Sequence, residues 1–177
     1  VQAAQGGQRL GIGLGFSVNT NSADGRNFGL GASASVAQVD DSTSARIEGG
    51  SSLTASGALQ TVTVQAYDRT DIGIGGGSLY AGGKGGVGLA VTYAEIDDGT
   101  RDVVEAKLDA STLTNFYTVD LSARDASRIA SGAAGLGGGS DTSTFAGSFA
   151  INNIGGHHTA SVSGSTITGA GTLNVNL

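Results

Sequence analysis

The feature that most constrains the fold of this chain is an internal repeat, with a spacing of the 57 residues that separate Val62 from Val119. Shifting the sequence by this spacing aligns Val62, Val64, Ala66, Asp68 and Ile72 with Val119, Leu121, Ala123, Asp125 and Ile129. The residues between these positions vary freely, as from Thr63 to Asp120. Apolar residues kept at every second position indicate strands with one buried face, stacked on copies of themselves. The repeat therefore favours a solenoid over an enzyme core.

Other segments repeat with nearly the same spacing. Ala34, Ala37, Val39, Asp40, Asp41 and Thr43 match Val91, Ala94, Ile96, Asp97, Asp98 and Thr100. Residues 45–48 and 51–54 match residues 106–109 and 111–114, and match again at 160–163 and 165–168. The opening residues 10–13 resemble residues 72–75 and are interpreted as the tail of an earlier copy.

The organisation along the chain is uniform, so we expect one elongated domain over residues 1–177. The expected repeat boundaries are 1–28 (partial), 29–85, 86–142 and 143–177 (partial). Neither end resembles the capping unit of a natural solenoid. The sequence is therefore interpreted as a fragment or as a polymerising subunit.

The repeat length leads to a specific prediction of the winding. Because 57 is three times 19, we predict an all-β, right-handed, single-stranded parallel β-helix with three coils in each repeat. At about 4.8 Å between stacked strands, about nine such coils would make a rod about 45 Å long. A repeat of two coils, each of about 28 residues, is an alternative that the repeat length also allows. The glycine-rich stretches at 11–15, 73–88 and 132–139 are interpreted as tight corners.

The composition agrees with a thin core and excludes several classes of function. Glycine supplies 32 of 177 residues, and Pro, Cys, Met and Trp are absent. The lack of cysteine excludes disulfides and zinc–thiolate sites. A net charge of −6 disfavours nucleic acid or anionic lipid as a partner. No run of 18 apolar residues indicates membrane insertion, and the first residues show no signal-peptide pattern.

Several segments resemble the repeats of large filamentous bacterial adhesins, of the leukotoxin and filamentous-haemagglutinin type. The resemblance rests on a glycine-rich strand followed by residues 90–96, 106–114 and 119–129. It implies a β-helical shaft that is exported to the cell surface for adhesion or biofilm formation, and it transfers no site residue. The chain departs from the family at the turn before the Val-x-Val strand. That turn commonly carries Gly-Asp, whereas Gly57–Ala58 and Asn115–Phe116 stand here.

The chain offers few candidates for metal binding. His157 and His158 are adjacent, so on a strand their side chains point to opposite faces and do not readily share a metal. The pairs Asp40–Asp41 and Asp97–Asp98 recur one repeat apart and suggest a column of carboxylates. Calcium requires six to eight oxygen ligands, and no calcium-loop motif is present. We therefore expect Asp-rich turns, no metal and no cofactor.

Candidate nucleotide and catalytic motifs are equally weak. Residues 82–86, Gly-Gly-Lys-Gly-Gly, lack the outer glycine and the Ser or Thr of a phosphate loop. Residues 29–34 imitate a dinucleotide fingerprint but precede a strand pattern instead of a helix. Asp125 with Arg124 and Arg128 resembles the acidic and basic set of β-helical polysaccharide lyases, but Asp68 with Arg69 repeats it. We therefore nominate no catalytic residue and expect no enzyme activity.

The sequence predicts a structural segment or subunit of a secreted surface filament, namely a bacterial adhesin shaft that acts in adhesion or in a biofilm matrix. The first alternative is an extracellular subunit that polymerises head to tail, joining the strand near Leu177 to the strand near Leu10. The second alternative is a β-helical carbohydrate-active enzyme or lectin, which needs a groove of aromatic and acidic residues. Host or bacterial receptors and glycans are further expected partners. The aromatic residues do not cluster at equivalent repeat positions; they include Tyr67, Tyr80, Tyr93, Phe116 and Tyr117.

Overall fold

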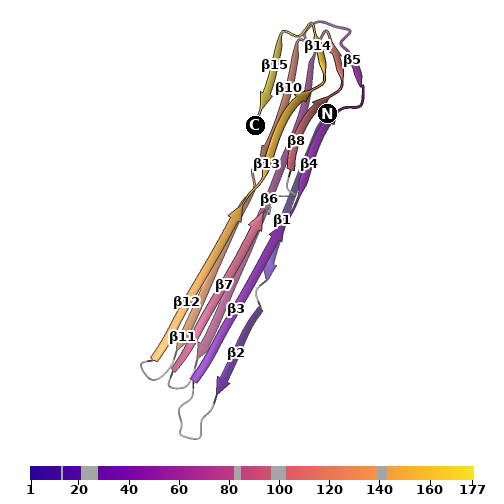
Figure 1. The fold of residues 1–177 in the computed structure, drawn as a ribbon. Helices are drawn as coiled ribbons and strands as arrows, with labels where there is room; N and C mark the ends of the chain where they lie inside the picture. The colour runs from indigo at the N-terminus through magenta and orange to yellow at the C-terminus, as the bar shows by residue number, and fades with distance from the viewer. Residues whose placement is uncertain (13, 21–27, 82–84, 97–102, 139–142) are drawn as a thin grey trace.

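The computed structural model describes residues 1–12, 14–20, 28–81, 85–96, 103–138 and 143–177. These residues form strands that assemble into four sheets, here called A to D (Figure 1). Sheet A contains β1 (Gln2–Ile12), β6 (Thr61–Ala81), β10 (Thr118–Asp125), β11 (Arg128–Gly138) and β15 (Thr172–Asn176). Sheet B contains β2 (Leu14–Thr20), β3 (Phe28–Val39), β7 (Gly85–Ile96) and β12 (Ser143–Ile154). Sheet C contains β4 (Ser42–Ile47), β8 (Val103–Asp109) and β13 (His157–Ser163). Sheet D contains β5 (Ser52–Thr54), β9 (Thr112–Thr114) and β14 (Thr166–Thr168).

Within the described ranges, no helix has the length and apolar character needed to cross a membrane.

The chain passes through the four sheets in the same order each time. One pass runs along β6, β7, β8 and β9, and the next runs along β10 and β11, then β12, β13 and β14. Strands from successive passes are parallel neighbours in all four sheets. The prediction of an all-β chain with stacked parallel strands is confirmed.

The pairing register shows that one 57-residue repeat is one pass, not three coils. Val62 pairs directly with Val119, and Val64 pairs with Leu121. The predicted coil number was wrong because the glycine-rich stretches taken as corners lie largely inside long strands. Residues 73–81, for example, continue β6 without a break.

This correction also changes the shape of the molecule. The 21 residues of β6 span about 70 Å at about 3.3 Å per residue, whereas each further pass adds only about 4.8 Å. The long axis of the molecule therefore runs along the strands, as Figure 1 shows. The expected rod of about nine coils, with its axis across the strands, is wrong.

The shorter repeated segments stack as their sequences predicted. Ala45 and Ala160 both pair with Ala106, and Leu53 and Ile167 both pair with Leu113. The opening segment stacks one residue away from the predicted alignment. Leu10 pairs with Gly73 instead of Ile72, because glycine-rich strands specify their pairing register only weakly.

Strand β2 breaks the parallel order. It pairs antiparallel with β3 and so covers the edge of sheet B in the first pass. An added antiparallel strand is one way in which proteins protect a sheet edge from unwanted pairing. The expectation that neither end carries a covering element was therefore wrong for this edge.

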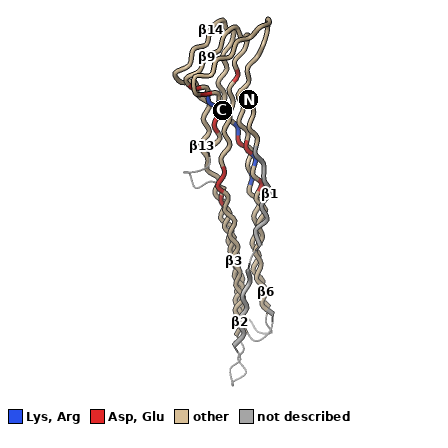
Figure 2. Tube along the Cα trace, turned by 90° about the vertical axis from the view of Figure 1, so that its right-hand side faces the viewer, with Lys and Arg blue, Asp and Glu red and all other residues tan. Residues whose placement is uncertain are grey.

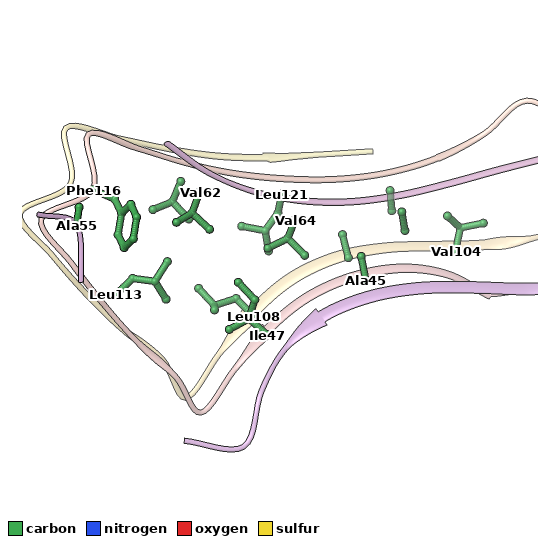
Figure 3. Packing of buried hydrophobic residues seen from close by; sticks show 14 residues of the cluster. Ala45, Ile47, Ala55, Val62, Val64, Val104, Leu108, Leu113, Phe116 and Leu121 are labelled. Carbon is green, nitrogen blue, oxygen red and sulfur yellow. The ribbon is translucent and has the colours of Figure 1, made fainter. Parts of the chain in front are cut away.

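The apolar core lies mainly in the part of the molecule enclosed by sheets A, C and D, here called the head. Figure 3 shows its side chains pointing into a wedge between these sheets. Val64, Leu108, Leu113, Val119 and Leu121 are all 0% exposed. At about 25 cal/mol per Å² of buried apolar surface, side chains of this size each contribute about 1.5–3 kcal/mol.

The rest of the molecule, here called the arm, has sheet B packed against β11 and the second half of β6. A smaller cluster around Ile72, Ile74 and Ile96 begins this region. Beyond it the two sheets approach closely: a Cβ on Gly135 would lie 2.5 Å from the carbonyl oxygen of Gly147. The glycines therefore allow close contact between the sheets of the arm instead of forming corners.

Candidate functional site

Two carboxylates lie inside the stack, between the head core and the Ile72 cluster. Asp68 in β6 is 1% exposed and pairs in register with Asp125 in β10. Asp125 Oδ1 accepts hydrogen bonds from the backbone N–H of Ser127 at 2.8 Å and from Ser127 Oγ at 2.6 Å. Among the residues that the structure describes, the oxygens of Asp68 have no hydrogen-bond partner of standard geometry. Asp68 is therefore the more costly of the two groups to ionise.

Burial raises the pKa of Asp68 above the ordinary value of 3.8. The neighbouring carboxylates of Asp41 and Asp125 raise this pKa further, while the Arg69 backbone N–H and His158 act in the opposite direction. The neutral form of Asp68 is thus favoured relative to an exposed aspartate.

The predicted histidine pair is divided between the two faces of β13. His157 pairs with Val103, and His158 pairs with the buried Val104, so only His158 faces the interior side. His158 Nε2 lies 3.7 Å from Asp125 Oδ2. Among the described residues, no group of three or more His, Cys, Asp or Glu side chains is placed to hold a metal ion.

The predicted column of aspartates is only partly visible. Asp40 is exposed, and Asp41 Oδ1 accepts a hydrogen bond from the backbone N–H of Ser42 at 2.9 Å. Asp97 and Asp98 lie outside the described residues. Asp40 and Asp41 therefore form a turn in which the carboxylate of Asp41 accepts a hydrogen bond from a nearby backbone N–H.

The acidic and basic residues that suggested lyase chemistry are placed on different faces. Asp68 and Asp125 point inward, whereas Arg69 and Arg128 both reach Asp71 on the outer face of sheet A, at 3.1 and 3.5 Å. Arg124 is also exposed. Neither buried carboxylate thus shares a cleft with these guanidinium groups.

The two glycine motifs serve a packing purpose. Gly29 in β3 and Gly86 in β7 lie beside the ring of Tyr80, which is 5% exposed. A Cβ on either glycine would come within about 2 Å of that ring, at 1.5 Å for Gly29 and 2.0 Å for Gly86. The glycines thus accommodate an aromatic side chain, not a phosphate. Residues 82–84 of the second motif, which include Lys84, lie outside the described residues.

No described residue covers the edge of the last pass, which is formed by the outer sides of β11 to β15. Its inward-facing residues are the counterparts of buried ones in the preceding pass. Ile154 is 50% exposed, whereas Ile96, with which it pairs, is 0% exposed. Val175 is 45% exposed, whereas its partner Leu121 is 0% exposed. This edge carries both apolar side chains and the backbone groups of a strand that can pair further.

A second unusual surface is the outer face of sheet B. Its largest side chains point to solvent, including Phe145, Phe149 and Ile151 at 62, 64 and 53% exposed. From the sequence, the apolar residues of these strands were expected to lie inside, so this surface was not predicted. Val91, which was matched with Ala34 as a conserved apolar position, lies on it and is 39% exposed. The signal was present in β3, where Gly and Ser alternate with larger Leu and Val.

Comparison of the chain with models of protein families, with curated proteins and with solved structures gave no match.

Proposed function

We propose that this chain is a segment or subunit of a right-handed β-solenoid filament. It serves as an extracellular, surface-exposed adhesin shaft that holds weakly adhesive surfaces away from the cell. The architecture of parallel strands in four stacked sheets supports the solenoid. A right-handed winding is the usual one for parallel strands linked by a crossover. The resemblance of residues 90–96, 106–114 and 119–129 to filamentous adhesin repeats supports the adhesive role.

The observation that carries this proposal is the retention of the same inward side chains through successive passes. Ala45, Ala106 and Ala160 occupy one column, and Leu53, Leu113 and Ile167 occupy another. A stack built this way lengthens by adding passes, because each pass buries the apolar side chains of the one before it. Length and repeated surface, not a reaction centre, are what such a structure supplies, and many weak contacts then add through multivalency.

The solenoid part of the proposal is tested by lengthening the chain. A second copy of residues 86–142 is inserted after residue 142, and thermal unfolding is compared with that of the parent chain. We expect a folded protein with a higher melting temperature, because one more internal pass becomes fully covered. A protein with a lower melting temperature, or with no folded state, would contradict the stacked-repeat mechanism.

The location and adhesive role require a separate test. Antibodies raised against the folded chain are applied to intact and to permeabilised cells of the source organism. We expect equal labelling of both, and we expect the antibodies to block cell attachment to a surface or to other cells. Labelling that requires permeabilisation would refute the shaft role.

End-to-end polymerisation is a second candidate, and one observation favours it. Strand β15 occupies the levels of Thr61 to Gln65 in sheet A, and β1 begins at the level of Gln65. In a head-to-tail stack, β15 of one copy and β1 of the next would share one strand position of sheet A, with a small shift of the chain ends where Asn176 and Gln2 both fall at the level of Gln65. Electron microscopy of the purified chain should then show fibrils whose strands are spaced by about 4.8 Å along the fibril axis. Species of fixed size would exclude this candidate.

A further inference from the structure

The outer face of sheet B is apolar along most of its length. Residues from β3, β7 and β12 lie in register and form rows across the sheet. One row contains Leu30, Val87 and Phe145, and another contains Ala34, Val91 and Phe149. Phe145 and Phe149 are more than 60% exposed, at 62 and 64%. Exposed apolar surface that continues across three strands is typical of an interaction site, unlike single exposed apolar residues.

Charge is nearly absent from this face. Figure 2 shows charged residues in the head and near its junction with the arm, while the arm around β3 and β6 is tan. The only charged residue at the outward positions of β3, β7 and β12 is Glu95, which ends the apolar rows. Glu95 accepts a hydrogen bond from Asn153 Nδ2 at 2.9 Å. It also raises the pKa of Tyr93 through a side-chain hydrogen bond. A polar row thus borders the apolar surface.

The face is large enough for a specific interface. Each of its three strands has 12 residues and spans about 40 Å, and three strands are about 14 Å wide. One copy therefore offers about 560 Å², so two copies packed face to face bury about 1,100 Å². This area exceeds the approximately 1,000 Å² expected of a biological interface.

In one of the apolar rows, the side-chain sizes on this face are complementary to those of a second copy. In the row of Val91, β12 carries the large Phe149 and β3 carries the small Ala34, whereas in the row of Val87 the two outer residues, Phe145 and Leu30, are both large. A twofold axis parallel to the strands places β12 of one copy over β3 of the other, so Phe149 meets Ala34. Two sheets packed in this way are about 10 Å apart.

A lipid surface is a poorer occupant than a second copy. The free backbone edge of β12 would lose its water on insertion into a bilayer, and each unpaired amide costs several kcal/mol there. Packing between two sheet faces leaves the same edge in water. We propose that the outer face of sheet B binds a second copy of this chain in an isologous, face-to-face dimer. This inference is independent of the proposed adhesive role.

The experiment compares two substitutions at equally exposed positions. Phe149→Glu lies on the outer face of sheet B, and Leu136→Glu, at a residue 61% exposed, lies on the outer face of sheet A. Sedimentation velocity over a wide concentration range gives the oligomeric state, and circular dichroism checks the fold. Phe145→Glu serves as a second variant in case Phe149→Glu unfolds.

We expect the parent chain and Leu136→Glu to sediment as dimers. Phe149→Glu, or Phe145→Glu in its place, should raise the dissociation constant more than about a hundredfold, because a carboxylate would be desolvated in the interface. A monomeric parent chain would overturn the inference. So would oligomers that persist equally in both kinds of variant, because association through strand edges would leave this face unused. Binding of the monomer to neutral phospholipid vesicles, lost in Phe149→Glu, would assign the face to lipid and overturn the dimer.

Discussion

Replacing Leu121 with alanine tests the assignment of the head core most quantitatively. Leu121 is 0% exposed and lies between Val64 and Val175 in sheet A, with its side chain in the wedge shown in Figure 3. The substitution removes three carbon atoms, worth about 2.4 kcal/mol at about 0.8 kcal/mol per buried methylene. The cavity left in a core fixed by neighbouring strands adds to this loss. We expect a total of about 3–4 kcal/mol.

The assay is urea-induced unfolding followed by circular dichroism, with Leu136→Ala as the matched control. Leu136 undergoes the same chemical change on an exposed surface, where the expected effect is within about 0.5 kcal/mol. Leu121→Val, expected to cost about 1 kcal/mol, keeps the comparison measurable if the alanine variant does not fold. Equal losses at Leu121 and Leu136 would refute the assignment of the interior.

Three further outcomes are expected. Asp68→Asn should raise the melting temperature at pH 7, and the gain should shrink below the ordinary carboxyl pKa of 3.8. A raised pKa in the folded state means that neutral Asp68 contributes its full stability below pH 3.8, and that this contribution is lost as the pH rises through the folded-state pKa. A gain in melting temperature that does not depend on pH would contradict this reason. Gly135→Ala should cost about 1–3 kcal/mol, because its Cβ would lie 2.5 Å from a carbonyl oxygen of the facing sheet. Gly132→Ala is the control, since nothing lies within 4 Å of its Cβ, and an equal loss at both sites would argue against close sheet packing in the arm. A strong chelator should leave the melting temperature unchanged, and a fall of more than a few degrees would reveal a structural cation.

The repeat predicted the parts of the fold in which burial follows the apolar pattern. Val64 and Leu121 were expected to be stacked and inward, and they are paired neighbours at 0% exposed. The alternation in this segment is strict, and the core beside it is wide enough for full-sized side chains. In this segment the sequence pattern predicts one buried face per strand, and the structure has the same buried face.

The number of passes in each repeat could not be predicted from the sequence. The repeat length shows how often the residue pattern recurs, but it does not show where the chain turns from one sheet to the next. The chain turns once after 21 residues of β6, although glycines at 73 and 75 suggested earlier corners. The residues that face the interior of the arm could not be predicted from the apolar pattern either. Apart from Tyr80, whose ring lies against glycines, the inside is filled mainly by Gly, Ser and Thr because the sheets are so close, as with Ser35 at 2% and Thr92 at 0% exposed. The larger side chains therefore point outward, and a rule that places large apolar residues inside gives the opposite face.

Disulfide trapping tests most directly the central claim that residues one repeat apart are neighbours in adjacent strands. The chain contains no cysteine, so the double variant Thr63→Cys/Asp120→Cys has only one possible intramolecular bond. These positions pair directly, which places their Cα atoms about 4.8 Å apart, within reach of a disulfide. The control Thr63→Cys/Ser122→Cys is displaced two residues along the strand, to about 8 Å, beyond that reach. We predict rapid cross-linking within one chain for the first pair and little for the second, as judged by peptide mapping. Cross-linking of neither pair, as expected if three coils separated the two residues by about 14 Å, would contradict the account.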